Sequence, residues 1–254
     1  MLKAVRGKLR YDWRKGSSVL LGNYILYFLL ANRNLFKGIL LDLGCGSRPY
    51  GILYDREVDL WVASDLPKTK QGFNGNVISI GESLPFKSNS FDVVLCTEVI
   101  MHVDNPFAAL DEISRVVKED GDLILTGTFL YPVNEIPRDN WRFSFFGLEK
   151  ALRKSGLKPK LVLAKGGLMT MMAVFTLVSF VSLASLVGKR IGIDPLKCKV
   201  LRLMVALPQV VIWAIIKPLV ISKLRRLSRA PSHYESIFSM GYCIVAGKVQ
   251  GNKD

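Results

Sequence analysis

The chain has 254 residues, half of them hydrophobic and 22% charged, which excludes global disorder and allows one large domain with a buried core. Its four cysteines are scattered without a CxxC pair, and it has only two histidines. This composition argues against a disulfide framework and against a zinc cluster, so we expect no metal. No small-residue cleavage site follows an apolar run near the basic N-terminus, which argues against a cleaved secretory signal.

The net charge of +14 is concentrated in two segments. Residues 1–37 carry eight Lys or Arg residues against one Asp, and residues 166–230 carry ten against one, so the rest of the chain is close to neutral. The same two segments hold the most continuous apolar sequence. Basic charge beside apolar sequence is typical of contact with a membrane lipid surface. The charges alternate with aliphatic runs rather than stacking aromatic residues, which argues against nucleic acid as a partner.

From residue 38 onward, short apolar runs alternate with amphipathic segments. Strands are predicted at 38–42, 59–65, 76–80, 91–96 and 122–126, the last after a turn at 119–121. Between the last two lies a helix that Asp104 or Asn105 can cap, with Pro106 in its first turn, and a second helix covers about 145–154. Residues 240–248 are predicted as one more strand. This alternation predicts an α/β fold, a parallel sheet covered on both faces.

Residues 166–232 interrupt this alternation. Residues 166–188 carry no charge and would measure about 35 Å as a helix, against about 30 Å for a bilayer core. A basic loop at 189–202, an apolar run at 203–216 broken by Pro208, and a basic stretch at 223–229 follow. We favour a hairpin that lies in or dips into one leaflet, because a two-span hairpin would place the basic loop on the far side. The alternatives are a true two-span hairpin and two helices buried in a soluble lid or dimer interface.

Residues 18–31 are similar to this insertion but shorter, because they also form an apolar stretch next to basic sequence. At about 14 residues the stretch is short for a membrane span, and it suits packing on the sheet as well as membrane contact. The chain therefore divides into a basic N-terminal segment with an apolar helix (1–37), a core (38–165), an apolar and basic helical insertion (166–232), and a final core strand with the C-terminus (233–254).

The sequence LDLGCG at 41–46 directly follows a predicted strand. Two glycines one residue apart let the backbone turn tightly and approach a ligand closely. Asp65 ends the next strand, 19 residues after Gly46, where an acid can accept hydrogen bonds from ribose hydroxyls. A dinucleotide fingerprint would need a third glycine where the chain has Pro49. The motif therefore predicts a nucleoside ligand with little phosphate.

At this point the chain resembles the class I S-adenosylmethionine-dependent methyltransferases, in the subgroup similar to methyltransferase type 11. The resemblance covers about 38–165 plus 240–248. It is carried by LDLGCG at 41–46, Asp65, SLPF at 83–86, SFDVV at 90–94, Glu98 with His102, EISRVVKEDG at 112–121 and WRF at 141–143. It implies a Rossmann-like, seven-stranded sheet whose last strand is antiparallel, with S-adenosyl-L-methionine as the cofactor.

The resemblance also implies a set of site residues. The glycines would pass under the methionine part of the cofactor, Asp65 would bind its ribose, and residues 81–82 would meet its adenine. The cofactor-binding set implied is Asp42, Gly44, Cys45, Gly46, Asp65, Leu66, Gly81, Glu82, Thr97 and Glu98. On the substrate side, His102 and Asp139 are candidate catalytic bases for a hydroxyl or carbon acceptor, and Arg142 could hold an acidic group. The alternatives are a structural role for His102 and a turn at 137–143 pinned by an ion pair.

We therefore expect methyl transfer to a lipid-linked or amphipathic acceptor at the cytoplasmic face of the membrane, with peripheral or re-entrant attachment. A cytoplasmic location is the alternative. Two other functions fit parts of the sequence. An RNA methyltransferase would use the basic segments on phosphates, and a non-catalytic membrane scaffold would keep the fold without turnover.

Overall fold

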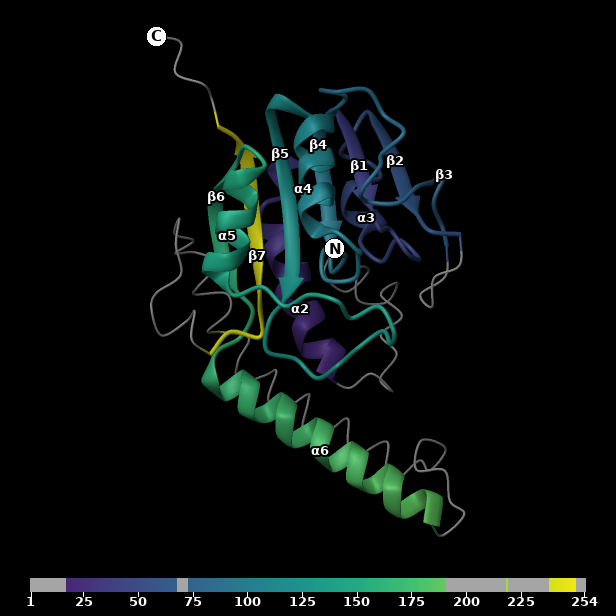
Figure 1. The fold of residues 1–254 in the computed structure, drawn as a ribbon, viewed down its shortest axis with the longest axis vertical. Helices are drawn as coiled ribbons and strands as arrows, with labels where there is room; N and C mark the ends of the chain where they lie inside the picture. Colours follow the sequence, from purple (N-terminus) through teal and green to yellow (C-terminus); the bar gives the residue numbers. More distant parts are fainter. Residues whose placement is uncertain (1–16, 68–72, 191–217, 219–237, 250–254) are drawn as a thin grey trace.

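A computed structural model describes residues 17–67, 73–190, 218 and 238–249. Within them, seven strands form one sheet in the order β3-β2-β1-β4-β5-β7-β6 (Figure 1). The strands are β1 (Ile39–Leu43), β2 (Leu60–Asp65), β3 (Val77–Ile78), β4 (Phe91–Thr97), β5 (Val117–Thr128), β6 (Leu157–Ala164) and β7 (Gly241–Lys248). Strands β1 to β5 pair in parallel, while β7 lies antiparallel between β5 and β6. The seven-stranded sheet with an antiparallel last strand is therefore confirmed.

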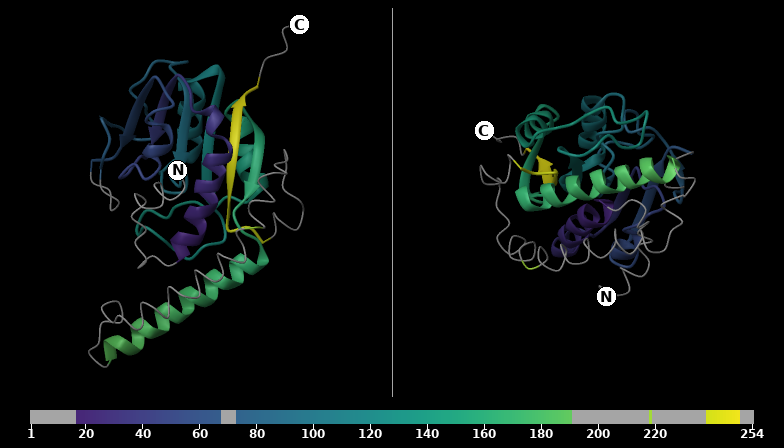
Figure 2. Two further views of the ribbon diagram at one scale, coloured as in Figure 1. Left: turned by 180° about the vertical axis from the view of Figure 1, so that it is seen from behind. Right: turned by 90° about the horizontal axis from the view of Figure 1, so that it is seen from below.

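Helices cover both faces of this sheet. Helix α2 (Ser17–Ala31) lies along one face, and α4 (Pro106–Val116) and α5 (Phe145–Lys154) lie on the other (Figures 1 and 2). Side chains of β4 alternate between the two layers, since Val94 and Cys96 join the core beneath α4 and α5, and Val93 and Leu95 join the core beneath α2. A single turn of helix, α3 (Gly51–Tyr54), and a 3-10 turn, η2 (Arg33–Leu35), complete the α2 side.

The apolar N-terminal helix packs on the sheet. Five α2 side chains are at most 3% exposed: Tyr24, Ile25, Leu26, Phe28 and Leu29. They join β-strand residues such as Leu40, Val93 and Ile124 in one core cluster. Of the two uses that the sequence allowed for residues 18–31, the structure shows the packing role.

Two strands differ from the sequence prediction. Strand β5 begins at Val117 and contains the predicted turn at 119–121, so that prediction is wrong. Phe91 pairs with Val117 while Val93 pairs with Asp122, and the extra residues form a bulge instead of a break. Strand β6 was not located from its residues, because Pro159 and exposed lysines interrupt it. It lies at the sheet edge, where a strand tolerates proline.

Helix α6 (Leu168–Arg190) follows β6 and crosses the end of the sheet at which the parallel strands finish (Figures 1 and 2). One side contacts the body, because Val174 is buried against Leu21 and Met240 and the Thr170 hydroxyl lies 3.2 Å from the Tyr24 hydroxyl. In the part of the chain that the structure describes, no helix has the length and hydropathy of a membrane span. The second apolar run of the predicted hairpin, 203–216, lies outside the described residues.

Candidate active site

The loop after β1 turns against the end of β2. The backbone N–H groups of Gly44 and Cys45 donate to the Ser64 carbonyl at 2.7 and 3.1 Å. Gly44 has a φ of +66°, and a Cβ placed there would lie 2.2 Å from Cγ2 of Val99. Glycine is therefore required at this position both by conformation and by space.

Asp65, the last residue of β2, is tied to the same loop. Its carboxylate accepts hydrogen bonds from the N–H groups of Gly46 and Leu66, each at 2.7 Å. A carboxylate offers about four acceptor positions, so Asp65 keeps capacity for hydroxyl donors of a ligand. Cys45 is buried beside it, and burial, followed by the charge of Asp42, raises the pKa of its thiol to about 12. The thiol is therefore neutral at physiological pH.

Asp42 lies beneath the loop, buried, and accepts a 2.5 Å hydrogen bond from the Tyr54 hydroxyl. Burial raises the pKa of this carboxyl to about 7, although the Tyr54 bond and the nearby Arg48 charge act in the opposite direction. The Arg48 guanidinium in turn lies 3.5 Å from the Trp61 ring centre and pairs with Asp55. No sequence pattern pointed to Tyr54 or Arg48, because only the fold brings them under the loop.

Glu98, directly after β4, occupies a polar cluster at the end of the sheet. Its carboxylate accepts from the hydroxyls of Thr126 and Thr128 at 2.6 and 2.7 Å and from the Lys165 ammonium at 2.5 Å. Burial alone would raise the pKa of Glu98, but the Lys165 charge and these hydrogen bonds outweigh it and hold the pKa below its usual value. Its neighbour Thr97 ends β4. Sequence reasoning missed the other three members of the cluster, and a charged residue ending the apolar run of β6 was the available signal.

The loop at 80–83 is tied to the start of α4. Glu82 Oε1 accepts from the backbone N–H groups of Asp104 and Asn105 at 2.8 and 3.1 Å. Asn105 itself caps α4, accepting from the N–H groups of Phe107 and Ala108, which settles the choice between two predicted caps. The Glu82 carboxylate thus has partners within the protein, and adenine contact at 81–82 stays a prediction.

His102 has a defined ring orientation. Its Nδ1 lies 2.5 Å from the Arg138 carbonyl oxygen. Because a carbonyl only accepts, Nδ1 carries the hydrogen, and Nε2 of the neutral ring keeps its lone pair. The loop that supplies Arg138 is fixed to the same turn, since the N–H groups of Asn140 and Trp141 both donate to the Met101 carbonyl. His102 is therefore held in the tautomer that a general base at Nε2 requires.

Asp139 and Arg142 form an ion pair within that loop. The Asp139 Oδ2 also accepts from the Asn134 N–H at 2.6 Å, and the Arg142 guanidinium reaches the Pro132 carbonyl at 3.4 Å. Among the described residues, Oδ1 of Asp139 is buried without a hydrogen-bond partner. The geometry matches the alternative of a turn pinned by an ion pair, and the substrate-side roles of both residues stay predictions.

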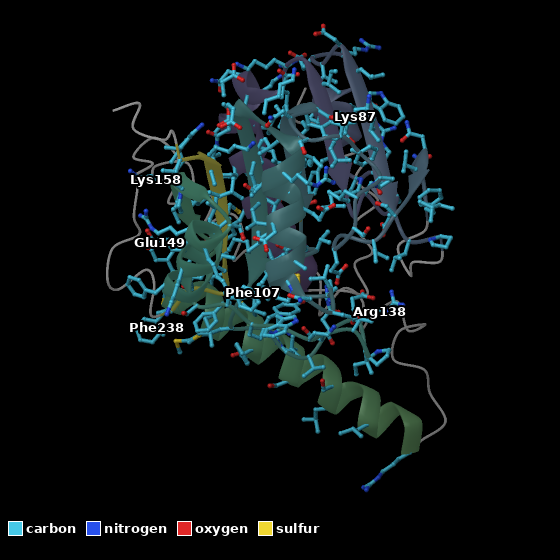
Figure 3. All side chains as sticks on the ribbon, turned by 45° about the horizontal axis from the view of Figure 1, so that its top comes forward. Lys87, Phe107, Arg138, Glu149, Lys158 and Phe238 are labelled. Atoms are coloured by element: carbon cyan, nitrogen blue, oxygen red, sulfur yellow. The ribbon has the colours of Figure 1, made fainter. Side chains whose placement is uncertain are left out.

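An aromatic group lies next to the His102 turn. The rings of Trp141 and Phe143 stack with centres 6.2 Å apart, and Phe107 meets both edge-on at 6.1 and 6.5 Å. Figure 3 shows Phe107 and Arg138 at the end of the molecule that α6 crosses, and Lys87 at the opposite end. The predicted ligand-binding end of the sheet thus combines polar groups with apolar surface.

Residues 41–125 match the family described as methyltransferase domain. Two uncharacterized proteins of Methanocaldococcus jannaschii are similar. One is 28% identical over 116 residues, which are 45% of this chain and 46% of that protein. The other is 37% identical over 92 residues, which are 34% of this chain and 39% of that protein. The chain thus spans less than half the length of these curated relatives. The solved cyclase SpnF has a TM-score of 0.52 at 19% identity over 90% of this chain and 81% of its own, which is a likeness of fold.

The family match covers the glycine loop, the acid that ends β2 and the turn after β4, and these features meet at one end of the seven-stranded sheet. Within residues 41–125 the chain is therefore similar to a methyltransferase domain. The resemblance implies S-adenosyl-L-methionine as the cofactor, and the residues present fit it. The loop around Gly44 has no room for a side chain between it and Val99, and Asp65 has acceptor capacity left for ribose hydroxyls.

Proposed function

We propose that this methyltransferase transfers the methyl group of S-adenosyl-L-methionine to a hydroxyl group of a lipid-linked or otherwise amphipathic acceptor at the cytoplasmic face of the membrane. The observation that carries the proposal is the course of α6. The helix crosses the end of the sheet at which the parallel strands finish, and the glycine loop and the His102 turn follow β1 and β4 at that end (Figure 1). An acceptor with an apolar part would meet that helix as its polar part reached the site.

Support for membrane contact comes from the outer side of α6. Exposed apolar side chains lie near both ends of the helix, at Leu168, Met172 and Phe175 and again at Leu183 and Leu186, with steps of three, four or eight residues. This spacing puts them on one side of the helix. The following residues, 189–202, include five Lys or Arg residues against one Asp. An exposed apolar stripe next to basic sequence suits a surface of anionic lipid.

Support for a hydroxyl acceptor comes from His102. The cofactor supplies a sulfonium methyl group that is already activated, so the protein's work is to align the nucleophile, exclude water and remove the acceptor's proton. Nε2 of His102 would take up that proton. The hydrogen bond from Nδ1 to the Arg138 carbonyl persists in the resulting imidazolium, and thus orients the ring before and after transfer.

The test for chemistry compares wild type and His102→Asn with radiolabelled cofactor, in parallel reactions with extracted membrane lipids and with RNA. Asparagine keeps a donor near the position of Nδ1 and removes the base. We expect binding of S-adenosylhomocysteine within threefold of wild type and a loss of about 10²–10⁴ in methylation rate. Full turnover by the variant would contradict the role of His102. Label that enters only RNA would support the RNA methyltransferase, and binding without transfer to any fraction would support the scaffold.

The test for membrane contact is sedimentation with vesicles that contain anionic lipid. Replacing Met172 and Phe175 by Glu puts two charges on the exposed stripe and should release the protein into the supernatant. The control is Leu60→Glu, an equally drastic change at an exposed apolar residue at the start of β2. Sedimentation of the α6 variant to the same extent as the control would contradict the proposed contact.

A further inference from the structure

Lys165 is a fully buried cation that reaches across the sheet. It follows the last residue of β6 and continues the ladder with β7, since its N–H donates to the Gly241 carbonyl and its carbonyl accepts from the Met240 N–H. Strands β7 and β5 separate β6 from β4, yet the Lys165 ammonium lies 2.5 Å from Oε1 of Glu98 at the end of β4. A Cβ at Gly241 would lie 2.6 Å from Cε of Lys165, so the lysine passes over β7 where that strand has no side chain.

The groups around the pair of Lys165 and Glu98 favour an ionised Glu98 carboxylate. Thr126 and Thr128 on β5 donate to the Glu98 carboxylate. The thiols of Cys96 on β4 and Cys243 on β7 also face the pair, and burial raises the pKa of each to about 12, so both are neutral. Within the described residues, Lys165 is the cation that the Glu98 carboxylate contacts. Removal of one member of a buried pair leaves the other charge without compensation.

Glu98 connects this pair to the cofactor loop. Its φ of +57° is uncommon for a residue with a side chain, and the four-membered polar cluster holds it there. The next residue, Val99, has its side chain against Gly44, and its carbonyl accepts from the His102 N–H at 2.8 Å. A shift of Glu98 would therefore displace both the wall behind the glycine loop and the turn that carries His102.

We propose that Lys165 is a positioning residue that acts through the Glu98 carboxylate to hold the turn at 97–102 against the glycine loop in the geometry that binds cofactor. The proposal rests on the proposed function, because it takes this site to be the cofactor site. Without the ammonium, the Glu98 carboxylate, whose side chain is 33% exposed, loses its ionic partner, so its pKa rises and Glu98 is held less firmly in its left-handed conformation. Where the carboxyl takes up a proton, it presents a donor where the cluster needs an acceptor.

The experiment is calorimetric titration with S-adenosylhomocysteine between pH 6 and 9, for wild type and Lys165→Met. The matched control is Lys160→Met, since Lys160 lies on β6, pairs with Asp122 at 2.7 Å and is half exposed. We expect Lys165→Met to bind at least tenfold more weakly than wild type at pH 6.5, with the ratio narrowing as pH rises and Glu98 ionises. The control should stay within twofold of wild type throughout. Equal affinities, or a ratio that does not change with pH, would overturn the proposal.

A double variant, Glu98→Gln with Lys165→Met, removes both charges and keeps side chains of nearly the same shape. If Lys165 acts through Glu98, the neutral Gln imitates the protonated carboxyl, so the double variant binds about as weakly as Lys165→Met at pH 6.5 and, unlike Lys165→Met, does not recover as pH rises. Where Lys165→Met does not fold, a folded double variant supports the proposal, and an unfolded one overturns it. Wild type that does not bind S-adenosylhomocysteine at any pH refutes the proposed function itself, whereas normal binding by Lys165→Met refutes the positioning role alone.

Discussion

The first prediction concerns the stability of a variant in the glycine loop, Gly44→Ala. A residue with a side chain at a φ of +66° carries a conformational cost of roughly 1–2 kcal/mol. The new Cβ would lie 2.2 Å from Cγ2 and 2.9 Å from Cγ1 of Val99, and relieving such a contact in a packed core costs roughly 1–3 kcal/mol more. We expect the free energy of unfolding to fall by about 2–5 kcal/mol, with weaker binding of S-adenosylhomocysteine, because the loop must move.

Urea denaturation separates the two contributions. Val99→Ala makes room for the new methyl group, so Gly44→Ala and Val99→Ala should couple by about 1–3 kcal/mol in a double-mutant cycle, while the conformational cost remains. Gly127→Ala is the matched control, because its Cβ would meet Ile100 Cγ2 at an ordinary 3.6 Å. A Gly44→Ala protein as stable as the control, or a cycle without coupling, would refute this account of the loop.

Three further outcomes follow from the geometry. The pKa of Asp42 rises from 3.8 to about 7 on folding, so the stability from its protonated form is complete below about pH 4 and is lost as pH rises through 7. Of a total of about 4 kcal/mol over that pH range, about 1.4 kcal/mol falls between pH 6 and 8.5, so denaturation at these two pH values should show Asp42→Asn gaining about that much on wild type, and a constant difference would contradict the raised pKa. Asp65→Ala should weaken S-adenosylhomocysteine binding at least tenfold by calorimetry, and unchanged affinity would remove the ribose contact. Asn105→Ala should destabilise the fold by about 1 kcal/mol in urea, through loss of the α4 cap, whereas a neutral effect would show that the Glu82 bonds suffice.

The parts of the site that sequence could predict are local in the chain. The glycine loop and Asp65 follow directly from strand ends, and parallel strands bring such ends to one edge of the sheet. The resemblance to the methyltransferases implied seven strands, which the structure confirms among the residues it describes. The closing strand at 240–248 was visible as an apolar run bounded by glycines.

The features that the sequence could not predict depend on packing between residues that lie apart in the sequence. Lys165 meets Glu98 only because β7 lies between β5 and β6 and has a glycine where the lysine crosses. Tyr54 reaches Asp42 from a helix of a single turn. The bulge at the start of β5 has the composition of a turn, and only the pairing with β4 distinguishes the two.

Strand β7 lies between β5 and β6 in the sheet but follows both of them in the sequence, so the sheet cannot close during translation until β7 has been made. Strand β7 pairs with β5 on one side and β6 on the other, through residues 241–248. Until these residues leave the ribosome, the edges of β5 and β6 that pair with β7 have no partner strand. The apolar α6 is already made at that stage. Open edges beside apolar surface favour aggregation, so we expect this chain to be most prone to aggregation before β7 has paired with β5 and β6.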